Sequence, residues 1–355
     1  VHFAPFEDLL AKQEASKYKD WFYIKRFPVE ISADCYECVG DFKWMPKLNT
    51  SSPEVRSFVL KVMSHWVDAA GIDGWRLDVA DEVDVNLWRL ARMELKQKYP
   101  NILLLGETWG DASRLLDGST MDTVMSYQFR DAVLDFVAKK EINAEKLDGR
   151  LNSILAKYHV STNHFLYNLL DSHDTPRFLQ DCDGNTQKLK LAAAFQIMFP
   201  GSPAIFYGDE AGIAGANDPD CRRCMVWDGE QDADLLAWYK KLIFIRKNQP
   251  AVREGKFCTN LCEGDVYGFI RWIDGGSFIY TVLNAGERRH VSLPVMENRR
   301  YTDLISGITC EPRPITQNHL FYNIDLLTYT GVLNLEIPEC GVMIFEPAPA
   351  AAAGL

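Results

Sequence analysis

The sequence contains neither a long hydrophobic run nor an excess of positive charge. None of its apolar stretches approaches the roughly 20 residues needed to span a bilayer, which excludes a membrane-spanning chain. It also lacks a basic, apolar leader at its N-terminus. The 38 Lys and Arg residues are outnumbered by 49 Asp and Glu, giving a net charge of −11. This balance argues against nucleic acid or an anionic membrane surface as the main partner.

The nine cysteines do not have the spacing of a disulfide framework. They are odd in number and spread through the whole chain, which favours free thiols in a reducing, cytoplasmic compartment. Two Cys-x-x-Cys pairs, Cys35/Cys38 and Cys221/Cys224, could together supply four thiolates for a structural zinc. Zinc modules usually keep their pairs close in sequence. We therefore keep two interpretations, a shared metal or free cysteines.

The sequence changes character three times along its length. Residues 1–51 are aromatic-rich and loop-like, and from 52 to 250 short apolar strands alternate with helical stretches. Residues 251–347 contain short β-branched or aromatic segments separated by Gly, Asn and Pro, which is typical of an antiparallel β-sandwich. The Ala/Pro-rich residues 348–355 are predicted to be disordered.

The alternation between 52 and 250 predicts parallel β/α units. A helix is predicted to begin at Ser52-Pro53, where Pro occupies the first turn. The other predicted elements are strands at Ile72–Asp78, Ile102–Glu107, Thr123–Tyr127, Phe165–Asp174 and Ala204–Gly208, and helices at Val83–Lys98, Asp131–Lys139, Lys188–Phe199 and Asp234–Lys247.

Three of these strands end in a carboxylate, namely Asp78, Glu107 and Asp174. Arg76 precedes Asp78 by two positions, so both side chains point to the same side of a strand, and the arginine would keep Asp78 ionised. His173 directly precedes Asp174. A single acid after a strand is often only the cap of the next helix. In a β/α barrel, however, the carboxyl ends of all strands form one face, where these groups would meet as an active site.

These segments resemble motifs of the α-amylase family of glycoside hydrolases. GIDGWRLDVADEV, LLLGETW and LLDSHDTPR resemble the motifs of its fourth, fifth and seventh barrel strands. MPKLNT at Met45–Thr50 and NDPDCRR at Asn217–Arg223 resemble markers of the neopullulanase and cyclomaltodextrinase branch. The motifs follow the family's order, and the resemblance covers roughly residues 1–347.

The resemblance implies a role for each matching position. Asp78 is similar to the nucleophile, Glu107 to the general acid/base, and Asp174 to the aspartate that stabilises the distorted sugar. The implied substrate-binding residues are Arg76, which holds Asp78; His173, which bonds sugar hydroxyls; Trp109, a stacking platform; and Asp218 and Arg222, which contact donor-side sugars.

The resemblance also implies a (β/α)8 TIM barrel followed by a C-terminal antiparallel β-sandwich. Only the last five β/α units are found, and residues 1–51 correspond to the loop-rich segment between barrel strand 3 and helix 3. The first three units, with their third-strand motif, and the branch's N-terminal carbohydrate-binding domain are not found. We therefore expect this chain to be a fragment of a larger enzyme.

The implied function is that of a retaining α-glucan hydrolase acting through a covalent glycosyl-aspartate. Its substrates would be maltooligosaccharides, cyclodextrins or pullulan. It would cleave their α-1,4 glucosidic bonds, with cleavage of α-1,6 bonds as an alternative. Two alternatives remain, a catalytically inert glycan- or partner-binding relative and a glucan-transferring member of the family. No organic cofactor is implied. Calcium, which many relatives hold, and assembly into a homo-oligomer are left open.

Overall fold

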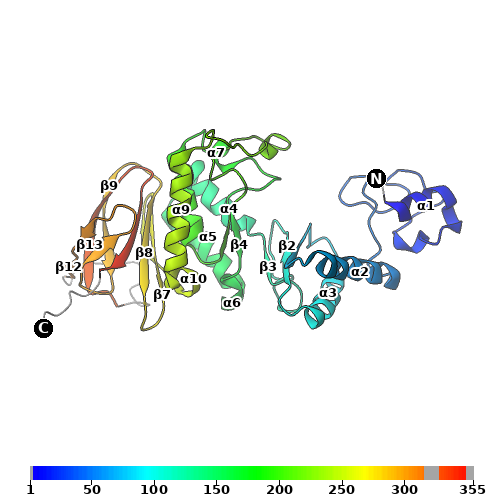
Figure 1. The fold of residues 1–355 in the computed structure, drawn as a ribbon, viewed down its shortest axis with the longest axis horizontal. Coiled ribbons are helices and arrows are strands. Elements are labelled where there is room, and N and C mark those ends of the chain that lie inside the picture. The colour runs from blue at the N-terminus through cyan, green and yellow to red at the C-terminus, as the bar shows by residue number, and fades with distance from the viewer. Residues whose placement is uncertain (1–2, 316–327, 349–355) are drawn as a thin grey trace. The chain divides into compact units, whose positions relative to one another are not determined.

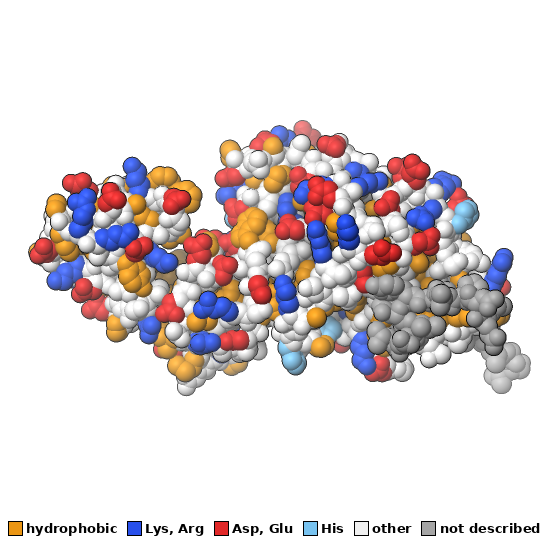
Figure 2. Space-filling view, turned by 180° about the vertical axis from the view of Figure 1, so that it is seen from behind, with side chains coloured by type: hydrophobic (Ala, Val, Ile, Leu, Met, Phe, Trp, Pro, Cys, Tyr) orange, Lys and Arg blue, Asp and Glu red, His pale blue; other side chains and the backbone are white. Residues whose placement is uncertain are grey.

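The computed structural model describes residues 3–315 and 328–348. They fall into two compact units, residues 1–124 and residues 125–355. Of the predicted tail, only Ala348 lies within the described residues, and its N–H donates to the carbonyl of Arg300 at 2.8 Å. No helix in this described part is both long and apolar enough to cross a bilayer. Figure 2 shows hydrophobic side chains scattered among charged ones on the visible face.

The N-terminal part of the first unit has a core of its own. It begins with α1 (Ala4–Lys12), a helix that the loop-like composition did not predict. Isolated antiparallel bridges then pair Phe22 with Leu48 and Cys38 with Pro46, which fold the loops back on themselves. These contacts fix the Met45–Thr50 segment in place. The core residues are Phe6, Leu9, Trp21, Phe22, Val29, Cys35, Tyr36 and Val55.

The rest of the first unit alternates helices with parallel strands, as predicted. Its first helix begins with Pro in the first turn and ends at Gly71, whose φ of 63° provides the left-handed cap. The elements are α2 (Pro53–Ala70), β1 (Gly74–Leu77), α3 (Val85–Lys98), β2 (Leu103–Gly106) and β3 (Thr123–Val124).

Strands β1 and β2 run parallel, with Arg76 opposite Leu105 and Leu77 opposite Gly106. Asp78 and Glu107 therefore follow their strands at the same level of the sheet. The sheet has the order β1-β2-β3, so β2 is its central strand, and its residues from Leu104 to Gly106 are buried. This register alone brings the two carboxylates to one edge.

The second unit places a parallel strand pair among helices. Strands β4 and β5 pair in parallel, with Asn168 opposite Pro203. Every residue from 191 to 198 of α8 is buried, as expected for a helix covered on all sides. The elements are α4 (Tyr127–Val133), a π-helical turn (Leu134–Ala138), α5 (Ala144–Lys157), α6 (Val160–Asn163), β4 (Tyr167–Leu169), α7 (Phe178–Asp181), α8 (Thr186–Met198), β5 (Ser202–Ala204), α9 (Ala233–Asn248) and α10 (Pro250–Glu254).

The C-terminal part of the second unit is antiparallel. A six-stranded sheet of order β11-β10-β14-β8-β7-β6 and a three-stranded sheet of order β12-β13-β9 share one apolar core. The other face of the larger sheet lies against the helices (Figure 1). There Tyr267 and Phe269 pack with Phe195 of α8. The strands are β6 (Lys256–Glu263), β7 (Val266–Trp272), β8 (Phe278–Asn284), β9 (Arg289–Val295), β10 (Tyr301–Asp303), β11 (Thr309–Cys310), β12 (Arg313–Pro314), β13 (Gly331–Ile337) and β14 (Val342–Pro347).

Candidate functional site

Arg76 bridges the two carboxylates of the first unit. Its Nη1 donates a hydrogen bond to Asp78 Oδ1, and its Nη2 lies 2.7 Å from Glu107 Oε1. The spacing of two residues along β1 puts Arg76 and Asp78 on the same side, as predicted. The second ion pair, from Arg76 to Glu107, was not predicted, because it depends on the register of β1 with β2.

The two carboxyl groups occupy different environments. Glu107 is 3% exposed, and its Oε2 accepts a hydrogen bond from the Val79 N–H at 3.0 Å. Burial, with the nearby negative charge of Asp78, raises the pKa of Glu107 despite the opposing effects of the Val79 N–H and Arg76. The Asp78 side chain is 70% exposed. One carboxyl thus tends to keep its proton while the other faces solvent.

Val79 has an unusual backbone conformation next to Asp78. Its φ of 44° lies in the left-handed region, which β-branched residues rarely adopt. The hydrogen bond from its N–H to Glu107 Oε2 holds this conformation, and the Ala80 N–H binds the Glu107 carbonyl at 2.8 Å. Strain of this kind clusters at functional sites. It supports the assignment of this edge as a site.

A mainly apolar pocket lies beside Asp78. It has a volume of about 330 Å³ and lies between the segment Met45–Thr50 and the turn after β1. The sequence predicted Asp78 and the Met45–Thr50 segment as important, but not the pocket that they share. Its lining residues are Val39, Met45, Pro46, Lys47, Leu48, Thr50, Val59, Asp78, Val79, Glu82, Val83, Asp84, Leu87 and Trp88.

Trp109, the predicted stacking platform, lies on the loop after β2 and is 50% exposed. The residue before it, Thr108, is buried, and its hydroxyl donates to Asp81 Oδ2 at 2.7 Å. This bond ties the loop after β2 to the loop after β1. The indole is thereby attached to a fixed backbone while much of its surface is open to solvent.

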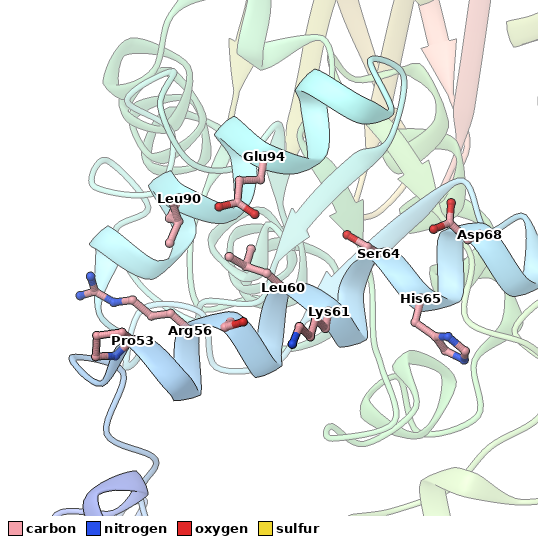
Figure 3. A pocket seen from close by; sticks show the side chains of 10 residues that line it. Pro53, Arg56, Leu60, Lys61, Ser64, His65, Asp68, Leu90 and Glu94 are labelled. Atoms are coloured by element: carbon pink, nitrogen blue, oxygen red, sulfur yellow. The ribbon is translucent and has the colours of Figure 1, made fainter.

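A second pocket of the first unit, about 660 Å³ in volume, lies between α2 and α3 (Figure 3). Arg56, Lys61 and His65 line it together with Asp68 and Glu94. None of the predicted site residues contributes to it. Its mixed charges do not select a ligand of one sign.

The second unit brings four predicted residues together. His173 Nε2 lies 3.0 Å from Asp174 Oδ2, and Arg222 Nη2 lies 3.1 Å from Asp174 Oδ1. The Nε of Arg222 donates to the His173 carbonyl at 2.9 Å and lies 2.7 Å from Asp218 Oδ1. These side chains are all between one third and slightly over half exposed. They form a polar surface that can exchange its hydrogen bonds for those of a ligand.

Each unit therefore holds one group of predicted residues, with Arg76, Asp78, Glu107 and Trp109 in the first. Sequence reasoning missed Arg177, which is fully buried and lies four residues after His173. No local signal identified it, because the carbonyls that it binds belong to residues 30 to 44 positions away in the sequence.

The cysteines of the two Cys-x-x-Cys pairs are all free thiols and lie in different units. Cys35 is buried and contacts the Pro28 carbonyl, whereas the Sγ of Cys221 donates to the His173 carbonyl at 3.2 Å. Within residues 3–315 and 328–348, no group of three or more His, Cys, Asp or Glu side chains is arranged to hold a metal ion. These contacts do not test the shared zinc, which was one of the two interpretations of the pairs.

Comparison with known proteins gives the chain a family. Residues 3–234 match the catalytic domain of α-amylase. The chain is 41% identical over 300 residues to a cyclomaltodextrinase of Thermoanaerobacter pseudethanolicus, covering 84% of this chain and 52% of that protein. It is 42% identical over 312 residues to neopullulanase 2 of Thermoactinomyces vulgaris, covering 86% and 53%.

Solved structures agree with these relatives. A cyclomaltodextrinase structure superposes with a TM-score of 0.87 at 36% identity, covering 98% of this chain and 58% of that one. The chain thus spans about half the length of the curated relatives that it matches. Its parallel β/α units and C-terminal antiparallel sheets are those of the TIM-barrel fold of these proteins. The chain belongs to the α-amylase family of glycoside hydrolases, alongside cyclomaltodextrinases and neopullulanases.

Proposed function

We propose that the chain is part of a retaining α-glucan hydrolase that cleaves α-1,4 glucosidic bonds, with α-1,6 bonds as an open alternative. The observation that carries this proposal is the pair of carboxyl groups held by one guanidinium, with Glu107 buried and Asp78 exposed. A retaining glycosidase needs one protonated and one ionised carboxyl on either side of the scissile bond. The pair beside Arg76 provides both.

In the first step, the Glu107 carboxyl gives its proton to the glycosidic oxygen, and the C1–O bond breaks. Asp78 attacks C1 and forms a glycosyl ester. The raised pKa of Glu107 supports its role as the acid, because it favours the protonated form. The Arg76 contact supports Asp78 as the nucleophile, because it orients the carboxylate.

In the second step, the Glu107 carboxylate removes a proton from water, and the water oxygen attacks C1. The ester bond to Asp78 breaks, which restores both carboxyl groups with net retention at C1. Two carboxyl groups and water complete this cycle. The proposal therefore requires no organic cofactor, and calcium stays open.

Sugar binding is proposed for the polar surface of the second unit and for Trp109. His173 and Arg222 can donate to sugar hydroxyls, while Asp174 and Asp218 can accept from them. Trp109 offers an exposed aromatic face on which a pyranose can stack. Support comes from a neighbouring structure named as a complex of cyclic α-maltosyl-(1→6)-maltose hydrolase with its cyclic sugar, at 28% identity and a TM-score of 0.80.

A second candidate is glucan transfer, in which a sugar hydroxyl replaces water in the second step. The mainly apolar pocket beside Asp78 favours this candidate, because an acceptor bound there would exclude water from the glycosyl ester. The third alternative, an inert binding protein, is less well supported because Asp78, Glu107 and Asp174 are all present.

The chain is further proposed to belong to a longer enzyme, since it covers only 52–53% of curated relatives. A cytoplasmic location is proposed as well. Its support is the set of nine free thiols and a relative named intracellular maltogenic amylase from Bacillus subtilis, which is 37% identical over 311 residues.

The proposal is tested by measuring reducing sugar released from β-cyclodextrin and maltoheptaose by the 355-residue chain and by its Asp78→Asn and Glu107→Gln variants. We expect release by the parent and a loss of at least about 10³-fold in each variant, the size that removal of a nucleophile or acid typically causes. Gln128→Glu, an exchange of the same size elsewhere in the fold, serves as the control.

Near-normal turnover by either variant would contradict the assigned roles. Absence of turnover in the parent would contradict activity of the isolated chain. The same variants would then be measured in a version extended at the N-terminus to the length of the relatives, where turnover should appear and depend on Asp78.

A further inference from the structure

A buried charged cluster lies under the loops that carry His173, Asp174 and Arg222. It consists of Arg177, Asp171 and Asp209, which are 0%, 2% and 4% exposed. Charged side chains are almost never this deeply buried without a partner. Neither the fold nor the two steps proposed above accounts for the cluster.

Arg177 joins three separate stretches of backbone. Its Nε donates to the Cys221 carbonyl at 2.8 Å, and its Nη1 donates to the Tyr207 carbonyl at 2.6 Å. Its own backbone N–H donates to the Gly215 carbonyl at 2.9 Å. A Cβ at Gly215 would lie 2.5 Å from the Asp220 carbonyl oxygen, so only glycine permits this close approach. The loops after β4 and β5 are thereby locked to each other.

The guanidinium of Arg177 is also fixed in orientation. Its Cζ lies 3.9 Å from the centre of the Phe206 ring and 4.7 Å from that of Tyr207. Nη1 makes a further contact of 3.2 Å with Asp209 Oδ1. Stacking and hydrogen bonding together leave the group a single position.

Asp171 and Asp209 interact with each other, and burial raises the pKa of both carboxyls, which favours a pair that holds one proton. Oδ2 of Asp171 accepts from the Phe178 N–H at 2.6 Å, while its Oδ1 is buried and receives no N–H hydrogen bond. Burial is the largest cause for both carboxyls, and the charge of Asp171 adds to it at Asp209, whose pKa is raised well above its ordinary value.

The cluster is connected to the ligand-facing surface. Cys221, whose carbonyl Arg177 holds, donates its Sγ to the His173 carbonyl at 3.2 Å. The next residue, Arg222, donates to the same carbonyl and pairs with Asp174. A displacement of the Cys221 backbone would therefore move His173 and Arg222 together.

We propose that Arg177, buried beside Asp171 and Asp209, is the positioning residue for the His173–Asp174–Arg222 sugar-binding surface. This inference rests on the proposed function, because its kinetic test requires hydrolysis of maltoheptaose. Among the described residues, Arg130 of α4 and Tyr239 of α9 also interact with the pair, and Glu210 acts on Tyr239. Loss of the shared proton at high pH would leave an unbalanced buried anion and loosen both loops.

The test compares Asp209→Asn, Asp209→Ala and Arg177→Lys by kcat and KM for maltoheptaose across pH. Asparagine can donate to Asp171 and accept from Arg177, so Asp209→Asn should keep kcat within about threefold and retain it at alkaline pH, where that of the parent falls. Asp209→Ala and Arg177→Lys should lose about 100-fold in kcat. Equal losses in the Asn and Ala variants, with an unchanged pH profile, would overturn the proposal.

Arg271→Lys is the matched control. Arg271 is also fully buried and also binds three backbone carbonyls, those of Lys256, Met198 and Gly255, but it has no contact with the His173 loop. The Arg271→Lys variant should lower the unfolding temperature, as Arg177→Lys should, but it should leave kcat unchanged. If Arg177→Lys behaved in the same way, its role would be structural only.

A readout without turnover separates this inference from the proposed function. Amide hydrogen exchange at Arg177 and Phe178, corrected for the intrinsic effect of pH, should show protection that is lost at alkaline pH in the parent but retained in Asp209→Asn. Protection that is the same in Asp209→Ala as in the parent would overturn the inference. An inactive parent with the expected exchange pattern would overturn only the hydrolase activity of this chain.

Discussion

Arg76 serves two carboxyl groups at once, which gives it an influence on both partial reactions. Its contact with Asp78 orients the proposed nucleophile, and its contact with Glu107 opposes the effect of burial on the pKa of Glu107. The pKa of Glu107 is still raised, because burial is the larger effect. The protonated fraction of Glu107 at a given pH therefore depends on Arg76.

We expect Arg76→Met to move the alkaline limb of the kcat/KM profile to higher pH. The general acid works in its protonated form, and loss of the cation removes an effect that lowers its pKa, so the protonated form should persist further. Loss of positioning should also reduce kcat/KM by about 100-fold. The measurement is kcat/KM for β-cyclodextrin across pH.

Arg89→Met is the control, because Arg89 pairs with Asp117 at the surface of the same unit and is not among the groups that shift the pKa of Glu107. Its profile should match that of the parent. If the alkaline limb of the kcat/KM profile stayed in place or moved to lower pH in Arg76→Met, Arg76 would not set the proton affinity of Glu107.

At the scale of elements, a buried polar network joins α5 to β6 and β7. The Thr259 hydroxyl donates to Asp148 Oδ1 at 2.5 Å and lies 2.8 Å from the Tyr267 hydroxyl, which contacts the same Oδ1 at 3.2 Å. All three side chains are buried. A buried network of this kind fixes one relative placement of helix and sheet, because any other placement leaves polar groups unpaired.

Tyr267→Phe should lower the free energy of unfolding by about 1–3 kcal/mol. The change removes the hydroxyl that contacts Thr259 and Asp148, and both of these buried groups then lose a hydrogen-bond partner. Tyr207→Phe provides the comparison, since its hydroxyl binds the Arg223 carbonyl at an exposed position and should cost no more than about 0.5 kcal/mol. Urea unfolding of both variants measures the difference. Equal costs would mean that the network does not stabilise the fold.

The same network explains which elements could be predicted from the sequence. The parallel strands and α2, α3, α8 and α9 followed from apolar periodicity, although β5 spans Ser202–Ala204 and shares only Ala204 with the predicted Ala204–Gly208. Helix α5 and strand β6 were missed because each buries polar residues, Asp148 in the helix and Thr259 and Asn260 in the strand. Those residues fit only once their partner on the other element is known.

The residues of the candidate site likewise divide into those whose positions could be predicted from the sequence and those whose positions could not. Arg76, Asp78 and Glu107 were predictable because strand spacing and strand ends are local features of the chain. Arg177 was not, because its role depends on carbonyls 30 to 44 residues away in sequence. The proton shared by Asp171 and Asp209 likewise requires their burial to be known.

At the scale of the whole molecule, the C-terminal sheet is not an independent module of the second unit. Tyr267, Phe269, Ile279 and Leu283 of this sheet belong to the same buried cluster as the helices. The π-stacked and edge-on rings of Phe195 and Phe199 in the helical part contact the sheet directly. The two parts should therefore unfold together.

Truncation after residue 250 should abolish cooperative unfolding of the second unit, because it exposes the apolar face of α8. Truncation after residue 348 keeps every described contact and should unfold as the parent does. Calorimetry of the three proteins makes the comparison. A sharp transition in the protein ending at residue 250 would show that the helices are stable without the sheet.

The distribution of the thiols has a practical consequence for spectroscopy. All nine cysteines lie among the described residues, and Cys224 is the exposed one. Burial raises the pKa of Cys182 to about 12 and that of Cys262 further, so these thiols are largely closed to alkylating reagents at neutral pH. A maleimide dye would react first at Cys224, two residues from Arg222, and its emission would report sugar binding in the unmodified sequence.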